Sequence, residues 1–358
     1  MTKYFLMLTM LLSSTQVFAW GDLGHQAVAE VAQQNLTKKT QKAIEGILGI
    51  APLASAAIFP DIVRSDARFN GFSPYHFVEV YPFYRRVPSE LRLKGKNATT
   101  VLELYPQIFL DHRNDRNARM IALSYFIHVV GDIHQPLHVG NGIDLGANLC
   151  LVKWNLTGET EDTQLSNLHT VWDEKIIDYL KESQRKKSTA KRFFGYAELA
   201  KYASDNQKAA NYEEAKAVHY TSWMNDTVQM RNHLVYPDAA GQNKADVDFL
   251  RPYCGVAKHI AKYAQAGDRQ ALLDNYGYEG DINLLVNKLK TEIKDSDIPV
   301  LTNAYADQSL AIIKNQIYIA GLRLAHLLNT YFDRPEKYVL KQAQFRKGFK
   351  LEDLQIDL

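Results

Sequence analysis

Histidine and aspartate side chains, which bind divalent metal ions through nitrogen and oxygen, are concentrated in the first half of this chain. His128 and Asp132 have the i,i+4 spacing that puts two side chains on one face of a helix. His169 and Asp173 repeat that spacing. The full set of candidate metal ligands is His25, Asp61, His76, His128, Asp132, His138, His169 and Asp173.

Pro136 interrupts the chain between the first pair and His138. A helix that ends in such a turn can send His138 to a different ion from the one that His128 binds. A single His/Asp pair is more often a helix cap or a surface salt bridge, so the full set carries the argument. Imidazole and carboxylate ligands suit zinc, although manganese and other divalent ions accept them too.

The two cysteines, Cys150 and Cys254, are too few for a thiolate zinc cluster. In an oxidising compartment they could form one disulfide between the two halves of the chain, which their spacing alone does not establish. Zinc, if bound, must therefore be held by nitrogen and oxygen ligands.

The first 19 residues have the pattern of a signal peptide. Lys3 supplies the positive charge, Tyr4 to Leu12 the apolar core, and Val17 to Ala19 the small-residue cleavage site. The apolar core is too short for a membrane span. Cleavage would leave Trp20 with a free α-amine five residues ahead of His25, which makes the new N-terminus a candidate metal ligand. Cleavage elsewhere would remove that ligand and leave the others.

The elements that must position these side chains are mostly helices, because apolar residues recur at three-to-four spacing. The one predicted strand is Leu149 to Trp154, with a short β-hairpin as an option. No domain boundary is evident, so residues 20–358 are expected to form a single all-α domain. The predicted helices are Leu23 to Gln34, Lys38 to Leu48, Asn117 to Asp132, Leu165 to Tyr179, Tyr212 to Leu234, Gly255 to Gln265 and Asp307 to Leu328.

The formal net charge of the 358 residues is only +2. This balance argues against a protein that coats polyanions through a general basic field. Contact with nucleic acid would have to come from local patches and from bound metal ions. One such patch is an aromatic and basic segment with Tyr81, Phe83, Tyr84, Arg85, Arg86, Arg92, Lys94 and Lys96. A second basic run, from Arg185 to Arg192, is interpreted as surface.

Together these motifs resemble the S-one/P-one family of extracellular zinc nucleases. The resemblance runs from Trp20 to about Asp173 and extends less sharply to Ile319 to Ala325. It is carried by Trp20 five residues before His25, by Asp61 three before Arg64, by His76-Phe77, by the segment from His128 to His138 (HVVGDIHQPLH), and by Leu168 to Asp173 (LHTVWD).

The resemblance implies an all-α fold shared with zinc phospholipases C and a site for three Zn²⁺ ions. One ion would be held by Asp61, His76, His128 and Asp132, a second by Trp20 (amine and carbonyl oxygen), His25 and the bridging Asp132, and a third by His138, His169 and Asp173. Two ions about 3.5 to 4 Å apart can share a water and provide hydroxide at neutral pH. The third ion would neutralise charge on the phosphate and on the leaving oxygen.

Two further residues are expected to act on the phosphate. Asp61 could orient or deprotonate the bridging water, and Arg64 could stabilise the pentacovalent phosphate by its charge. The alternative for Arg64 is a solvated arginine on a helix face.

The resemblance also implies three substrate-binding residues. Phe77 corresponds to a base-stacking phenylalanine, with a core aromatic as the alternative. Glu79 stands where the family usually has an aspartate that binds the base. Asn148 follows Gly146-Ala147, where the family has two glycines before an asparagine near the scissile phosphate. The implied substrates are single-stranded DNA and RNA, cleaved to 5′-phosphate products, and 3′-nucleotides.

Two other functions remain open at this stage. A zinc-dependent phospholipase C shares the fold, but its first histidine lies further from the terminal tryptophan than His25 lies from Trp20. A non-catalytic zinc-binding protein would explain the ligands, but it would not explain Arg64, Phe77 and Asn148. The protein is expected to be secreted or periplasmic and monomeric, without a membrane span.

Overall fold

The structure, a computed structural model, describes most of the chain from Trp20 to Val339. The described residues are 20–69, 71–80, 86–88, 96–142, 144–154, 164–187, 194–205, 219–238, 254 and 294–339. The predicted signal peptide, the predicted helix Gly255 to Gln265 and most of the aromatic and basic segment 81–96 lie outside these ranges.

The fold is built mainly of helices, as the sequence predicts. The α-helices are α1 (Asp22–Gln34), α2 (Lys38–Leu48), α3 (Leu53–Ala57), α4 (Phe59–Ile62), α5 (Ala98–Leu110), α6 (Arg116–Asp132), α7 (Leu168–Thr170), α8 (Ile176–Lys187), α9 (Tyr196–Ser204), α11 (Tyr220–Met230) and α15 (Asn303–Asp333). Short 3₁₀ helices are η1 (Val63–Ser65), η2 (Ala67–Phe69), η3 (Ser73–His76), η8 (Asp295–Asp297) and η9 (Pro335–Lys337). Two π-helical turns are η5 (Val171–Lys175) and η6 (Arg231–Val235).

Local sequence signals explain where several helices begin and end. Thr37 caps α2 by accepting a hydrogen bond from the Thr40 amide, and Gly49, at φ +79°, ends it. Asp115 caps α6 by accepting from two amides of the first turn. Thr302 caps α15 by accepting a hydrogen bond from the Tyr305 amide. These caps satisfy amides that a helix start otherwise leaves without partners.

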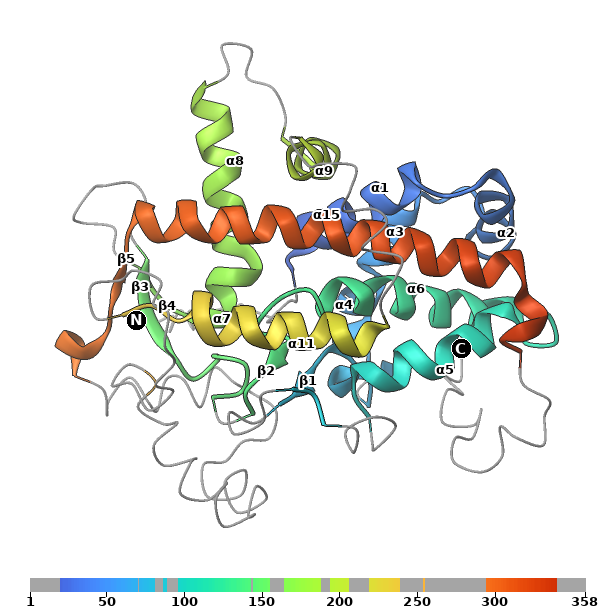
Figure 1. The fold of residues 1–358 in the computed structure, drawn as a ribbon, viewed down its shortest axis with the longest axis horizontal. Coiled ribbons are helices and arrows are strands. Elements are labelled where there is room, and N and C mark those ends of the chain that lie inside the picture. The colour runs from blue at the N-terminus through green and yellow to red at the C-terminus, as the bar shows by residue number, and fades with distance from the viewer. Residues whose placement is uncertain are drawn as a thin grey trace, which may run out of the picture.

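The longest helix, α15, runs along the length of the molecule and organises the packing of the others (Figure 1). It contacts α1, α2, α6, α8 and α9. The contact with α1 is close at Gly321, where an added Cβ would lie 2.5 Å from Val31 Cβ. The apolar interior continues through these helices as one cluster of buried side chains.

Strands contribute only small sheets. β1 (Val78–Glu79) pairs in parallel with β2 (Val139–Gly140). β3 (Leu151–Trp154) lies between antiparallel β4 (Gln164–Asn167) and parallel β5 (Val300–Leu301). The antiparallel pair agrees with the expected hairpin.

Most predicted elements within the described ranges are confirmed. The helices predicted at residues 23–34, 38–48, 117–132 and 307–328 are observed as α1, α2, α6 and α15, and the predicted strand at 149–154 as β3. The helix predicted from Tyr212 is described only from Tyr220, as α11 and η6. Among the described helices, none is long and apolar enough to cross a membrane.

One predicted helix is wrong over its first residues. Gln164 to Asn167 form β4 instead of the start of a helix, because they pair with β3 and complete its edge. The helical segment begins at Leu168, where Asn167 caps it by accepting from the Thr170 amide.

The predicted disulfide is confirmed. Cys150 and Cys254, 104 residues apart in the sequence, are joined and buried. Their sulfur atoms lie near Asp144, but bonded cysteines offer no thiolate to a metal ion.

Candidate metal centre

Seven elements or turns bring the eight candidate side chains together from distant parts of the chain. All eight are buried, with at most 5% of each residue exposed. His25 comes from α1, Asp61 from α4, His76 from the end of η3, His128 and Asp132 from α6, His138 from the turn before β2, His169 from α7, and Asp173 from η5.

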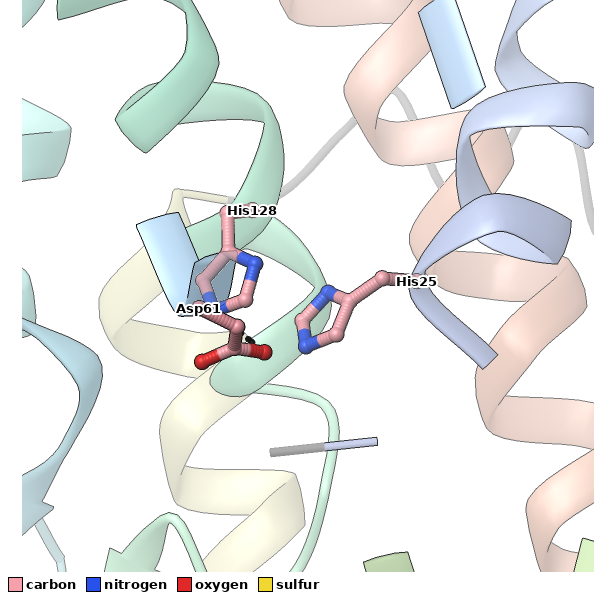
Figure 2. Close-up of side chains that lie close together, drawn as sticks. All are labelled: His25, Asp61 and His128. Carbon is pink, nitrogen blue, oxygen red and sulfur yellow. Dashed lines mark ion pairs between the residues drawn. The ribbon is translucent and has the colours of Figure 1, made fainter. Parts of the chain in front are cut away.

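Five of these side chains form what we call the central group: His25, Asp61, His76, His128 and Asp132. Figure 2 shows three of them, with the rings of His25 and His128 turned toward each other beside the Asp61 carboxylate. The two rings stack with centroids 3.7 Å apart. Nδ1 of His76 lies 2.9 Å from Nε2 of His128. Such close approach of ring nitrogens is expected where they share a ligand.

Asp132 lies at the middle of the central group. Its Oδ1 is 3.3 Å from His25 Nε2, and its Oδ2 is 3.4 Å from both His76 Nδ1 and His128 Nε2. The two oxygens of one carboxylate therefore face different histidines. This is the arrangement that a carboxylate bridging two ions requires.

Backbone carbonyls fix the orientation of three of the rings. Nδ1 of His128 donates to the Ala57 oxygen at 2.6 Å, and Nδ1 of His138 donates to the His76 oxygen at 2.9 Å. Nδ1 of His169 donates to the Gly146 oxygen at 2.6 Å. With Nδ1 protonated, Nε2 of each ring keeps its lone pair for a metal ion.

The carboxylates of the central group lack ordinary partners. Within the described part of the chain, neither oxygen of Asp61 or Asp132 accepts a hydrogen bond, and neither ring nitrogen of His25 has a hydrogen-bond partner. Buried polar atoms are normally paired, so these unpaired atoms indicate a ligand-binding site. A positive ion fits the donor set of carboxylate oxygens and imidazole nitrogens.

Burial dominates the electrostatics of this group. Desolvation raises the pKa of Asp61 to about 7 although Arg64 opposes it, and it raises the pKa of Asp132 with help from the charge of Asp61. Desolvation lowers the pKa of His128 to about 3. The pKa values of His25 and His76 are lowered for the same reason. The chain alone thus favours neutral side chains here, and a bound cation would restore the charged carboxylates.

The other three side chains form the outer group: His138, His169 and Asp173. Nε2 of His169 lies 3.1 Å from one oxygen of Asp173, and Nε2 of His138 lies 3.9 Å from the other. Burial lowers the pKa of His169, but the negative charge of Asp173 and the hydrogen bond to it outweigh that effect, so the pKa is raised. The three side chains could hold one ion.

Trp20 is completely buried beside both groups. Its indole donates to the backbone oxygen of Gly131 at 3.0 Å, and the amide of Gly21 donates to the backbone oxygen of Asp173 at 2.7 Å. The backbone at residue 20 therefore lies against the segments that carry Asp132 and Asp173.

The remaining candidates surround the groups less tightly. Nε of Arg64 is 3.4 Å from Asp61 Oδ1, and its side chain is 20% exposed. It lies on η1, a 3₁₀ turn after α4, and not on the same α-helix as Asp61. Phe77 and Glu79 are half-buried. Asn148 is buried, and its amide nitrogen donates to the Leu145 oxygen.

The loop that carries Asn148 has an unusual backbone. Leu145, Gly146 and Ala147 all have φ between 54° and 65°, in the left-handed region. Ala147 thus adopts the conformation that glycine favours at this place, despite its side chain.

Of the aromatic and basic segment, Arg86 and Lys96 are described and exposed. The other residues named in it lie outside the described ranges. The second basic run is helical and exposed at Arg185 and Lys186, as expected for surface residues.

Several residues outside the candidate set support the site. The amide nitrogen of Gln135 donates to Asp173 Oδ1 at 2.5 Å. His134, although inside the His128 to His138 segment, faces away from both groups, and its Nε2 accepts from Arg323 at 2.8 Å. Its backbone oxygen accepts from Gln316. Of these residues, His134 and Gln135 stand between two candidate ligands in the sequence.

Comparison with known proteins gives a consistent picture. A sequence profile of the family described as S1/P1 Nuclease matches residues 20–275. Endonuclease 2 of Arabidopsis thaliana is 28% identical over 182 residues, which cover 47% of this chain and 60% of that protein. Nuclease S1 of Aspergillus oryzae is 30% identical over 169 residues, 44% of this chain and 54% of that protein.

A third relative, Nuclease P1 of Penicillium citrinum, is 31% identical over 162 residues, 43% of this chain and 57% of that protein. The chain thus spans between half and two thirds of the length of these relatives.

Proposed function

Because the chain belongs to the S1/P1 nuclease family, we propose that it hydrolyses phosphodiester bonds in single-stranded DNA and RNA and leaves 5′-phosphate products. Removal of the phosphate from 3′-nucleotides is part of the same proposal. The observation that carries it is the central group, where buried aspartate oxygens have no hydrogen-bond partners among the described residues. A protein that only folded would not leave these atoms unpaired.

The donor set fits three zinc ions. Asp61, His76, His128 and Asp132 would hold one, His25, Asp132 and the Trp20 amine and carbonyl a second, and His138, His169 and Asp173 the third. When bound, such ions lower the pKa of water towards about 7 and neutralise charge on the phosphate. The two faces of Asp132, toward His25 and toward His128, support its bridging role.

The Trp20 ligand requires removal of the preceding residues, so the proposal includes residues 1–19 as a signal peptide and a secreted or periplasmic protein. The position of Trp20 against α6 supports this part, since its indole bonds to Gly131, next to Asp132. We further propose that residues 20–358 form a single domain that acts as a monomer.

Arg64 and Asp61 have the placement for acting on the reacting phosphate. Arg64 is partly exposed beside the buried Asp61 carboxylate, so its guanidinium lies at the solvent edge of the central group. From there it can pair with a phosphate oxygen and stabilise the charge that develops in the transition state. Asp61, adjacent to it, can orient the attacking water or accept its proton.

Phe77, Glu79 and Asn148 are the proposed substrate contacts. Phe77 directly follows His76 and is half-buried, so part of its ring remains available for a nucleobase. Stacking of this kind contributes about 1 to 3 kcal/mol and tolerates any base. Glu79 lies two residues further along, in β1, and the Asn148 side-chain oxygen has no hydrogen-bond partner in the described ranges.

The test is hydrolysis of a single-stranded oligonucleotide and of a 3′-nucleotide by protein that starts at Trp20. Asp132→Ala is the inactivating variant, and Asp333→Ala, an exposed aspartate paired with Lys39, is the matched control. We expect wild type and the control variant to turn over both substrates, with activity that a chelator abolishes and added zinc restores. We expect no turnover by Asp132→Ala. If zinc-loaded protein cleaves phosphatidylcholine but neither nucleotide substrate, the protein is a phospholipase C and not a nuclease. If zinc-loaded protein turns over none of these substrates, the remaining interpretation is a non-catalytic zinc-binding protein.

A further inference from the structure

A buried arginine outside both groups connects the two strands that follow His76 and His138. Arg231, the first residue of the π-helical turn η6, is completely buried. Its Nη1 donates to the backbone oxygens of Val80 at 3.2 Å and Val139 at 2.5 Å. Val139 belongs to β2 and Val80 directly follows β1, so one guanidinium holds both strands of the parallel sheet.

These two strands set the distance between the central and outer groups. His76 lies two residues before β1, and His138 immediately precedes β2. The amide of Val78 donates to the His138 oxygen, and His138 Nδ1 donates to the His76 oxygen. Strands of two residues cannot hold a register alone. The guanidinium adds a constraint across the sheet, at the first residue of β2 and just beyond the end of β1.

Burying the charged side chain of Arg231 costs folding free energy. Burial lowers the pKa of Arg231, and its Nη2 has no hydrogen-bond partner among the described residues. An apolar side chain of similar volume would usually give equal or greater stability. What an apolar side chain could not do is donate to carbonyls on two strands at once.

The other end of the same turn reaches the outer group. Tyr236, which directly follows η6, donates to Asp144 Oδ2 at 2.5 Å. The other oxygen of Asp144 accepts from the Ala147 amide at 2.7 Å. Between these contacts lies Gly146, whose oxygen accepts from His169. Tyr236 and Asp144 thus fix the loop that orients His169.

We propose that the segment Arg231 to Tyr236 is a positioning element for the metal ligands. Arg231 sets the separation of His76 and His138, and Tyr236 holds the loop behind His169 through Asp144. This inference rests on the proposed function only in taking the two groups as zinc sites. Supporting contacts of this kind typically change metal affinity by about 10- to 100-fold.

The experiment measures zinc affinity by chelator competition, with circular dichroism and Tm for each protein. Arg231→Met removes the guanidinium and Arg231→Lys keeps a donor. Arg119→Met is the matched control, since Arg119 also donates to a backbone oxygen, that of Phe109, but between α5 and α6. We expect a loss of about 10- to 100-fold in affinity for Arg231→Met, a partial recovery in Arg231→Lys, and no more than about a 2-fold change in the control.

Tyr236→Phe should lower the affinity for one zinc ion, that of the outer group, and leave the affinity for the others unchanged. It also serves if Arg231→Met does not fold. Folded Arg231 and Tyr236 variants with wild-type zinc affinity and a lowered Tm would overturn the proposal, because the segment would then be structural only. A wild type that binds zinc without hydrolysing nucleotides would refute the proposed function alone, whereas a wild type that binds no zinc would refute both.

Discussion

The central and outer groups use the same residue types but are held in different ways. In the outer group, Asp173 Oδ1 accepts one hydrogen bond, from Gln135, and Oδ2 faces His169 at 3.1 Å. In the central group, the oxygens of Asp61 and Asp132 accept no hydrogen bond from any described residue. The chain itself orients one carboxylate and leaves the other two without donors.

This difference indicates where bound cations matter most for the protein itself. Burial without donors costs both carboxylates their hydration, which raises the pKa values of Asp61 and Asp132, and the charge of Asp61 raises the pKa of Asp132 further. The outer group has already replaced part of that hydration with protein donors. Metal bound at the central group should therefore contribute to the stability of the protein. Metal bound at the outer group should contribute mainly to its activity.

The sharpest test of the comparison is the loss of one ligand from each group. Asp132→Ala removes the carboxylate that faces histidines on both sides and should lower kcat on an oligonucleotide by about 1,000-fold or more, since a bound ion supplies several kcal/mol to the transition state. His169→Ala affects the outer group alone and should cost about 10- to 100-fold. Equal losses in the two variants would contradict a division into two groups.

A second test uses the pH dependence of the protein without metal. Burial raises the pKa of Asp61 from its ordinary 3.8 to about 7. Between these pH values the folded chain keeps a proton that the unfolded chain has released, so the free energy of unfolding falls as pH rises through this window. Asp61→Asn removes this effect. In chelator the variant should be as stable as wild type near pH 4 and more stable above pH 7, by on the order of 4 kcal/mol.

Tm measured at intervals of one pH unit checks this expectation. The difference between variant and wild type should grow up to about pH 7 and then level off. Added zinc should reverse the order, because asparagine is a poorer ligand than a carboxylate. A difference that does not change with pH would show that Asp61 is not protonated in the metal-free protein.

A third test displaces a single ring of the central group. A Cβ at Gly131 would lie 2.8 Å from His25 Nδ1, so Gly131→Ala must push that ring away. Zinc affinity should fall by about 10- to 100-fold. Gly46→Ala is the control, also within a helix but with nothing within 4 Å of the added Cβ, and it should stabilise the protein by about 0.5 to 1 kcal/mol. Unchanged zinc affinity in Gly131→Ala would exclude His25 as a ligand.

The sequence predicts the helical class and the gathering of the candidate ligands well, because both follow from local spacing. His128 and Asp132 lie on one helix face as the i,i+4 rule requires. The sequence does not predict α5, whose interior contains Pro106, or β4, whose residues become a strand only by pairing with β3. Pairing between distant segments has no local signal.

Support for the site is the part that sequence reasoning could not reach. Asp173 lies in the π-helical turn η5, and Arg231 in the π-helical turn η6. Such turns often occur at functional sites, but no residue pattern announces them. Arg231 and Arg323 look like ordinary surface arginines in the sequence, and only the fold buries them beside the histidine segments.

The smallest expected effect concerns the donor that distinguishes the two groups. Gln135 donates to Asp173 Oδ1 and accepts from the Leu137 amide, both at 2.5 Å. Gln135→Met keeps the volume and removes both bonds, so kcat should fall by about 10-fold. Gln107→Met, which removes a glutamine bond to a backbone oxygen within α5, should leave kcat unchanged. In an Asp173→Asn background the effect of Gln135→Met should shrink toward none, because the two residues act as a unit. Additive losses in the double variant would mean that Gln135 acts by some path other than the Asp173 carboxylate, and the outer group would then be no better oriented by the chain than the central one.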